Sequence, residues 1–186
     1  MNKQLIKLAE TTLFMLEKRS WHSIKIDEVY NQIYINKKNS ENQVDDKLGL
    51  LRNINHYFDF KLHNITDSID QSTRKDMIFE IMMMRFDILQ IYRKPIIKIL
   101  EFFKKKPQEL VFLLPSLIES MISMAGLAKI PVVGLKGNLK VKGLLLIYFS
   151  SFLVWAKDNS ESLEKTMTSL DNHLDRAGKL LSIIKI

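Results

Sequence analysis

Apolar residues recur at steps of three and four along most of the chain, the spacing that places side chains on one face of an α-helix. This periodicity predicts helices over residues 3–18, 25–35, 48–65, 73–95, 95–107, 107–127, 139–157 and 160–184. Gly134 and Gly137 predict a loop before the last two helices, and Asn159 or Ser160 can cap the final one. Short alternating runs of β-branched residues are absent from the sequence, so the predicted fold is all-α.

The polar stretch INKKNSENQVDDK, residues 35–47, interrupts this pattern. A short third helix is predicted over residues 40–46, where Val44 is the single aliphatic residue, so this helix gains little free energy from docking. Tyr34 precedes the stretch, and tyrosine resists the positive φ angle that glycine tolerates, so a turn longer than a tight glycine turn is expected. The nine predicted helices form a head of three, residues 1–46, and a body of six, residues 47–186.

The composition excludes several classes of site. The chain of 186 residues has no cysteine, which excludes disulfides and thiolate metal sites and fits a reducing cytoplasm. Charges at Lys3, Lys7 and Glu10 interrupt the apolar core that an export signal needs, so a cytoplasmic protein is expected. The longest apolar run, residues 143–156, is shorter than the roughly 18 to 20 residues that span a bilayer, and it predicts a buried helix.

The net charge of +7 is distributed unevenly along the chain. Residues 1–61 contain ten lysine and arginine residues against eight aspartate and glutamate residues, so the predicted head is only weakly basic. Most of the surplus lies downstream, notably at Lys104, Lys105, Lys106, Lys129, Lys136, Lys140 and Lys142. Contact with a membrane surface is one interpretation of lysines that flank apolar segments, and a solvated surface is the more common one.

Segments of both the head and the body resemble the TetR family of transcriptional regulators. Residues 8–35, LAETTLFMLEKRSWHSIKIDEVYNQIYI, resemble the family's first two helices, with Trp21 at the aromatic position before the second. Lys47 falls on the lysine that opens the family's fourth helix and contacts a DNA phosphate. In the body, residues 154–174, VWAKDNSESLEKTMTSLDNHL, are the sharpest match, to a TetR-like subgroup of alphaproteobacteria.

The resemblance implies a ligand-responsive regulator that binds double-stranded DNA. Amides can pair with adenine edges and lysines with phosphates, so the candidates are Lys37, Lys38, Asn39, Asn42, Gln43 and Lys47. Asp45 and Asp46 would repel the same phosphates, and a solvated loop is the competing interpretation of this stretch. The body also resembles a TetR-fold lipid-binding accessory family of ubiquinone biosynthesis, which implies an alternative function: lipid or isoprenoid binding without DNA binding.

Two further sites follow from the resemblance. A pocket for a small apolar ligand or lipid would lie in the body, with a plain core as the competing interpretation; its candidates are Met83, Phe86, Phe102, Phe112, Met121 and Met124. The last two helices would form a four-helix bundle with a second copy, with a core within one chain as the competing interpretation; the candidates are Tyr148, Phe152, Trp155, Met167, Leu170 and Leu174. The four histidines are scattered and no catalytic motif occurs in the sequence, so no enzymatic activity, cofactor or metal site is expected.

Overall fold

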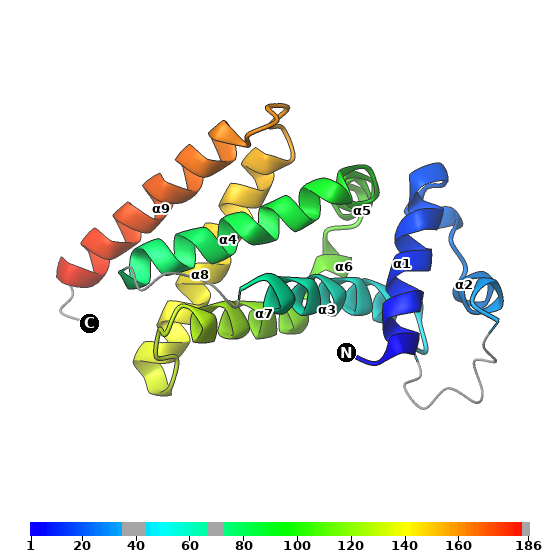
Figure 1. Ribbon diagram of the computed structural model, residues 1–186, viewed down its shortest axis with the longest axis horizontal. Helices are drawn as coiled ribbons and strands as arrows, with labels where there is room; N and C mark the ends of the chain where they lie inside the picture. Colours follow the sequence, from blue (N-terminus) through cyan, green and yellow to red (C-terminus); the bar gives the residue numbers. More distant parts are fainter. Residues whose placement is uncertain (35–43, 67–72, 184–186) are drawn as a thin grey trace. The chain divides into compact units, whose positions relative to one another are not determined.

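The structure is a computed structural model that describes residues 1–34, 44–66 and 73–183. Within these residues it is all-α and contains no strand, which confirms the predicted fold class. The elements in chain order are α1 (Lys3–Lys18), the 3-10 helix η1 (Trp21–Ser23), α2 (Ile26–Gln32), α3 (Lys47–Ile65), α4 (Arg74–Ile91), α5 (Arg93–Lys105), α6 (Gln108–Val111), α7 (Leu114–Leu127), α8 (Gly134–Trp155) and α9 (Glu164–Ile183) (Figure 1).

The described residues hold nine α-helices, the predicted number, but three parts of the chain differ from the prediction. Residues 44–46 of the predicted third helix are not helical, and residues 40–43 lie outside the described ranges, so α3 is the helix predicted as the fourth. The single helix predicted over residues 107–127 is two helices, α6 and α7. Pro115 in the first turn of α7 explains this break, because proline lacks the N–H that a continuous helix would need there.

The predicted loop at Gly134 and Gly137 is wrong, because α8 begins at Gly134 and includes both glycines. Gly134 has a φ of 72°, and a Cβ at Gly137 would lie 2.0 Å from the carbonyl carbon of Val132. The second glycine therefore lets the preceding loop pack directly against the helix. With 22 residues, α8 is also the one helix in the described ranges that could cross a membrane by length and composition, a test that core helices of soluble proteins also pass.

The chain folds into two compact units. Unit 1 comprises residues 1–61 and 88–117, and unit 2 comprises residues 62–87 and 118–186. In unit 1, α1 packs against α2 and α5. Lys98 of α5 donates from Nζ to three carbonyl oxygens at the end of α1, those of Leu16, Glu17 and Arg19, at 2.7, 3.1 and 3.2 Å. The division at residues 46 and 47 stays a prediction.

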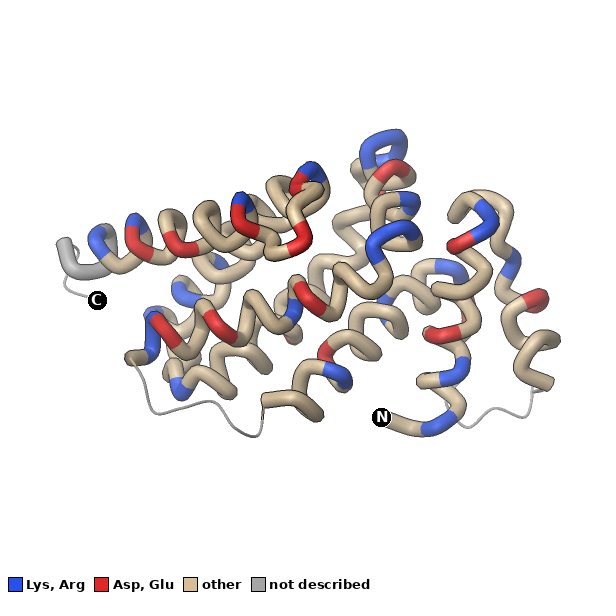
Figure 2. The backbone as a smooth tube through the Cα atoms, turned by 45° about the horizontal axis from the view of Figure 1, so that its top comes forward, with Lys and Arg blue, Asp and Glu red and all other residues tan. Residues whose placement is uncertain are grey.

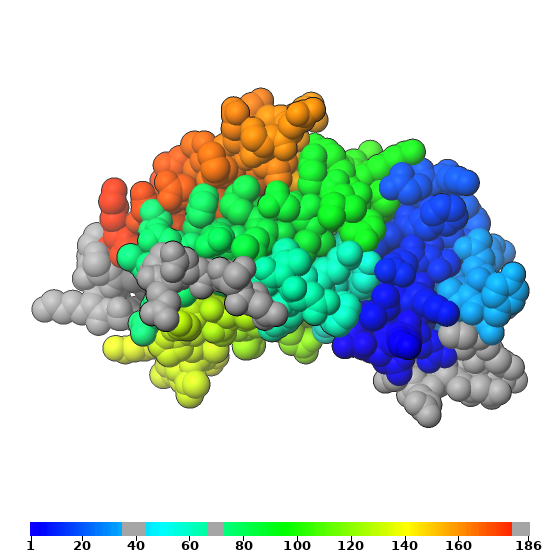
Figure 3. All heavy atoms as spheres, in the orientation of Figure 1, coloured from blue at the N-terminus to red at the C-terminus, as the bar shows by residue number. Residues whose placement is uncertain are grey.

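Unit 2 is built around α8, along which α9 folds back. The Phe86 ring of α4 stacks on Tyr148 of α8 with ring centroids 5.4 Å apart, and the buried Arg85 donates from Nε to the Tyr148 hydroxyl at 3.2 Å. In the space-filling view α9, orange to red, lies directly against α4, green (Figure 3). These contacts join α4, α8 and α9 within unit 2.

Candidate functional site

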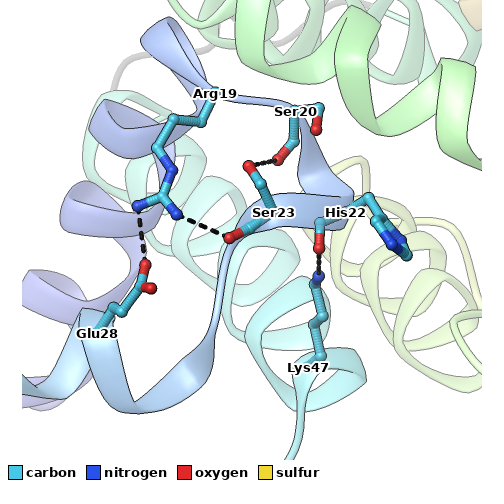
Figure 4. A network of polar contacts seen from close by, with 6 residues as sticks. All are labelled: Arg19, Ser20, His22, Ser23, Glu28 and Lys47. Carbon is cyan, nitrogen blue, oxygen red and sulfur yellow. Dashed lines mark hydrogen bonds and ion pairs between the residues drawn. The ribbon is translucent and has the colours of Figure 1, made fainter.

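Lys47, the predicted phosphate contact, opens α3 and reaches back to the 3-10 helix of the head. Its Nζ donates to the His22 carbonyl at 2.9 Å and lies 5.1 Å from the centre of the Trp21 ring (Figure 4). Burial lowers the pKa of Lys47, and the positive charge of Lys106 lowers it further. The amine is thus held at the turn between α1 and α2, beside a second lysine that the fold brings from α5.

The same turn is tied to α2 by an exposed ion pair. Arg19 donates from Nη1 to Glu28 at 2.8 Å and from Nη2 to the Ser23 carbonyl at 2.8 Å (Figure 4). Glu28 lies in the first turn of α2, where the helix dipole also favours an anion. The pair therefore fixes the entry to the second helix of the head.

The predicted reading residues Lys37, Lys38, Asn39, Asn42 and Gln43 lie outside the described ranges. After them, Val44 is buried, and its backbone N–H donates to the Tyr30 hydroxyl of α2 at 2.9 Å. Asp46, expected to face DNA phosphates, accepts from the Gly49 backbone N–H in the first turn of α3. Val44 therefore provides one apolar anchor. The Asp46 carboxylate is occupied by a hydrogen bond at the start of α3.

Tyr34 adopts the conformation that it was expected to avoid. Its φ is 56°, in the left-handed region, so the expectation that tyrosine would exclude this geometry is wrong. The side chain is 97% exposed, and the backbone N–H donates to the Asn31 carbonyl at 3.2 Å. Because the ring meets no packing constraint, the turn carries only the local backbone cost of about 1 to 2 kcal/mol.

The fold changes the interpretation of the charge distribution. Unit 1 contains α5 as well as the predicted head, so it carries sixteen lysine and arginine residues against ten aspartate and glutamate residues. Six of the seven net positive charges of the chain thus belong to the unit that contains α1 and α2. The sequence made the head look weakly basic because the basic residues of α5 lie about 80 positions away from α1.

The six predicted ligand contacts are divided between the two units. Met83, Phe86, Met121 and Met124 belong to unit 2, and all but the half-buried Met83 are fully buried there. In unit 1, Phe102 is half-buried and the Phe112 ring is 53% exposed. None of the six lines the groove described next, and their role as ligand contacts stays a prediction.

A groove of about 770 Å³ lies within unit 2, a volume typical of small-molecule sites. Its apolar residues come from α4, the loop before α8, α8 and α9: Ile78, Ile130, Pro131, Leu139, Leu144, Leu146, Ile147, Leu174 and Ala177. Gly143 and Gly178 also line it, and each would leave open space around an added Cβ. The lining is thus mostly apolar, with open space beside both glycines.

Charged residues ring this groove, with more cations than anions: Arg74, Lys75, Lys140, Lys142 and Lys179 against Asp175. Lys75 lies 2.8 Å from Asp171 and also pairs with Asp175, and these hydrogen bonds raise the pKa of Lys75. No serine, threonine, asparagine, glutamine, tyrosine or histidine lines the groove among the described residues. The groove suits an apolar molecule with an anionic end better than a sugar, which needs many neutral hydrogen-bond partners.

Four of the six predicted dimer contacts are buried within the chain itself: Tyr148, Trp155, Leu170 and Leu174. Phe152 is half-buried, with its ring centroid 5.3 Å from that of Trp155, and the Met167 side chain is 43% exposed. Tyr148 packs on Phe86 of α4, and the other five lie on α8 and α9, which pack against each other. The prediction that they contact a second copy is not tested by a single chain.

An apolar seam nevertheless remains exposed along α8. Leu139, Leu146 and Leu153 repeat every seven residues and are 48%, 70% and 42% exposed, with the small residues Gly143 and Ser150 between them. This spacing of four and three residues is that of a helix that packs along another helix. Both signs of charge lie along the neighbouring α9 (Figure 2).

Comparison with known proteins finds a likeness in structure. No family model matches the chain, and no curated protein matches it in sequence. Among solved structures, the crystal structure of the TetR transcriptional regulator from Nitrosomonas europaea ATCC 19718 superposes with a TM-score of 0.72 at 16% sequence identity. The match covers 95% of this chain and 99% of that chain. The chain therefore has a TetR-like fold.

Proposed function

We propose that this protein is a ligand-responsive, DNA-binding transcriptional regulator that acts as a homodimer. The observation that carries the proposal is the likeness of fold to a TetR transcriptional regulator over 95% of the chain. Lys47 at the start of α3 and the positive charge of unit 1 support contact with a phosphate backbone. The base contacts come from the polar stretch before α3. No enzymatic step is part of this proposal.

The test of DNA binding is a selection from the protein's own genome. Purified protein is incubated with sheared genomic DNA at near-physiological salt, and the retained fragments are sequenced. Salt must be near physiological because phosphate contacts alone give tight binding at low salt. Recovery of a few sites with twofold symmetry supports the proposal. Failure to retain any site, together with co-purified lipid, would instead support the lipid-binding alternative.

The dimer forms through the seam of Leu139, Leu146 and Leu153, with the small residues between them allowing close approach of two α8 helices. Changing both Leu146 and Leu153 to glutamate places four charges in the twofold interface, so sedimentation should show monomers. Val111→Glu, an exposed apolar residue of α6, is the control and leaves the dimer intact. A double variant that sediments as a dimer would refute this interface.

The ligand occupies the groove of unit 2, which adjoins the dimer seam because Leu139 and Leu146 belong to both. Its apolar floor and basic rim favour a molecule with a hydrocarbon part and an anionic end. A long-chain fatty acid that binds the folded protein should raise its melting temperature, and the alcohol of equal length should raise it less because it lacks the anionic end. Ile147→Trp narrows the groove and should weaken the fatty acid's effect; an unchanged effect would place the ligand elsewhere.

A further inference from the structure

The end of α5 carries three consecutive lysines, Lys104, Lys105 and Lys106, followed by Pro107. All three side chains are exposed, and none forms an ion pair within the described part of the chain. The tube view shows basic residues gathered at α5 (Figure 2). Three adjacent cations without an acidic partner repel one another, so an anion held against them would relieve this repulsion.

The lysine cluster is held next to the predicted DNA-binding head by buried contacts of unit 1. The Phe102 ring of α5 lies 6.2 Å from the ring of Trp21 in the head, measured between centroids. The Nζ of Lys47 lies 5.1 Å from the centre of the same Trp21 ring. The charge of Lys106 is near enough to Lys47 to lower the pKa of Lys47. The cluster and the predicted phosphate contact thus share one positive surface.

We infer that Lys104, Lys105 and Lys106 bind the phosphate backbone of DNA beside the head, extending the surface that Lys47 begins. This inference rests on the proposed function. Residues 1–61, which include the head, have a surplus of about two charges, too few for the several phosphate contacts that a regulator needs at physiological salt. The fold supplies the missing cations from α5, a helix that would otherwise be assigned to the ligand-binding body.

DNA is favoured over a membrane surface because the aromatic residues of α5 face into the protein. Phe103 is 9% exposed and Phe102 is half-buried against Trp21, so the helix offers lysines without an apolar face to insert. Val111 and Phe112 of the next segment are exposed, however, at 60% and 53%. Binding to anionic vesicles is therefore measured alongside DNA binding.

The experiment compares three variants of the full chain. In the first, Lys104, Lys105 and Lys106 are all changed to alanine, and in the second they are all changed to arginine, which keeps the charge. The matched control changes three exposed lysines of unit 2 to alanine: Lys136, Lys157 and Lys165. Affinity for a duplex of arbitrary sequence is measured at several salt concentrations, and circular dichroism checks that each variant is folded.

The alanine variant should lose about 0.9 from the slope of log K against log salt for each phosphate contact removed, at most about 2.7 for each protomer and about 5.4 for the dimer. The arginine variant and the unit 2 control should keep the wild-type slope. If the wild type binds DNA and the alanine variant has the same slope, this inference is wrong and the proposed function is unaffected. Loss of binding to phosphatidylserine vesicles with an unchanged DNA slope would assign the cluster to membranes. No DNA binding by the wild type, even at low salt, would contradict both.

Discussion

Replacing Asp158 with alanine should destabilise unit 2 more than any change to an exposed residue of the same loop. Asp158 lies between α8 and α9 and is 0% exposed. Oδ1 accepts from the Ser160 N–H and hydroxyl at 3.1 and 2.6 Å, and Oδ2 accepts from the Thr166 N–H and hydroxyl, both at 2.9 Å. One side chain thus holds the loop and the first turns of α9.

The size of this destabilisation follows from the hydrogen-bond donors that lose their acceptor in the variant. Both donors of Thr166 are buried, and a buried donor without an acceptor costs about 1 to 3 kcal/mol. Ser160 is half-buried and can bind water instead, so its loss adds little. Asp158→Ala should therefore lower the free energy of unfolding by about 3 kcal/mol, or lower the melting temperature by about 6 to 12 °C for a chain of this size.

Urea unfolding followed by circular dichroism measures this loss. Glu161→Ala, an exposed position in the same loop, is the control and should change stability by less than about 0.5 kcal/mol. Asp158→Asn should fall between the two, because its amide oxygen still accepts on one side while its NH₂ faces donors on the other. A loss below about 1 kcal/mol for Asp158→Ala would refute the reasoning, since the stranded donors alone should exceed it.

The same carboxylate also predicts a dependence on pH. Burial alone would raise the pKa of Asp158, but the hydrogen bonds from Ser160 and Thr166 outweigh it and lower the pKa well below its usual range. The folded pKa lies below the unfolded value of about 3.9, so the stabilisation is complete above that value and is lost as pH falls toward the folded pKa. The stability difference between wild type and Asp158→Ala should therefore shrink below about pH 4; a difference that stays constant down to pH 2 would contradict this.

Two further changes test the packing of each unit. Lys98→Met removes the three hydrogen bonds to the end of α1 and should lower the free energy of unfolding in urea by about 1 to 2 kcal/mol. The control is Lys94→Met: the exposed Nζ of Lys94 lies 3.8 Å from Glu17, and its loss should cost less than about 0.5 kcal/mol. Equal losses for the two variants would show that Lys98 does not stabilise the end of α1. Gly137→Ala should destabilise the protein by about 1 to 3 kcal/mol, because the added Cβ would collide with the loop before α8. Gly126→Ala, which has open space around its Cβ, should be neutral or should stabilise the protein by up to about 1 kcal/mol. If thermal unfolding ranks the two variants in the opposite order, the close contact at Gly137 is wrong.

Local patterns in the sequence were sufficient to predict most of the helices. The apolar steps of α1, α3 and α9 predicted those elements to within a few residues, because each helix buries one face. The start of α8 was misjudged because glycine signals a turn in most sequences, and only the position of Val132 explains why Gly137 suits a helix here. That contact depends on the folded loop.

The functional surfaces were harder to predict because distant elements form them. The groove combines Ile78 of α4, Ile147 of α8 and Leu174 of α9, and no local pattern links these three positions. The predicted caps of the last helix were Asn159 and Ser160, and the Ser160 hydroxyl does accept from the Glu164 N–H. The role of the neighbouring Asp158 was not predicted. The lysines at the end of α5 became candidates only from the fold, because Phe102 of α5 and Lys47 both contact the Trp21 ring.

The central claim is that the polar stretch before α3 reads bases, and a comparison of two variants in the genomic selection tests it most directly. The first variant changes Lys37, Lys38 and Asn42 to alanine, and the second changes Lys157 and Lys165, exposed lysines of unit 2. Wild type and the second variant should retain the same few twofold sites at physiological salt, while the first variant should lose them. Retention of those sites by the first variant, or random fragments from all three proteins, would contradict base reading by this stretch.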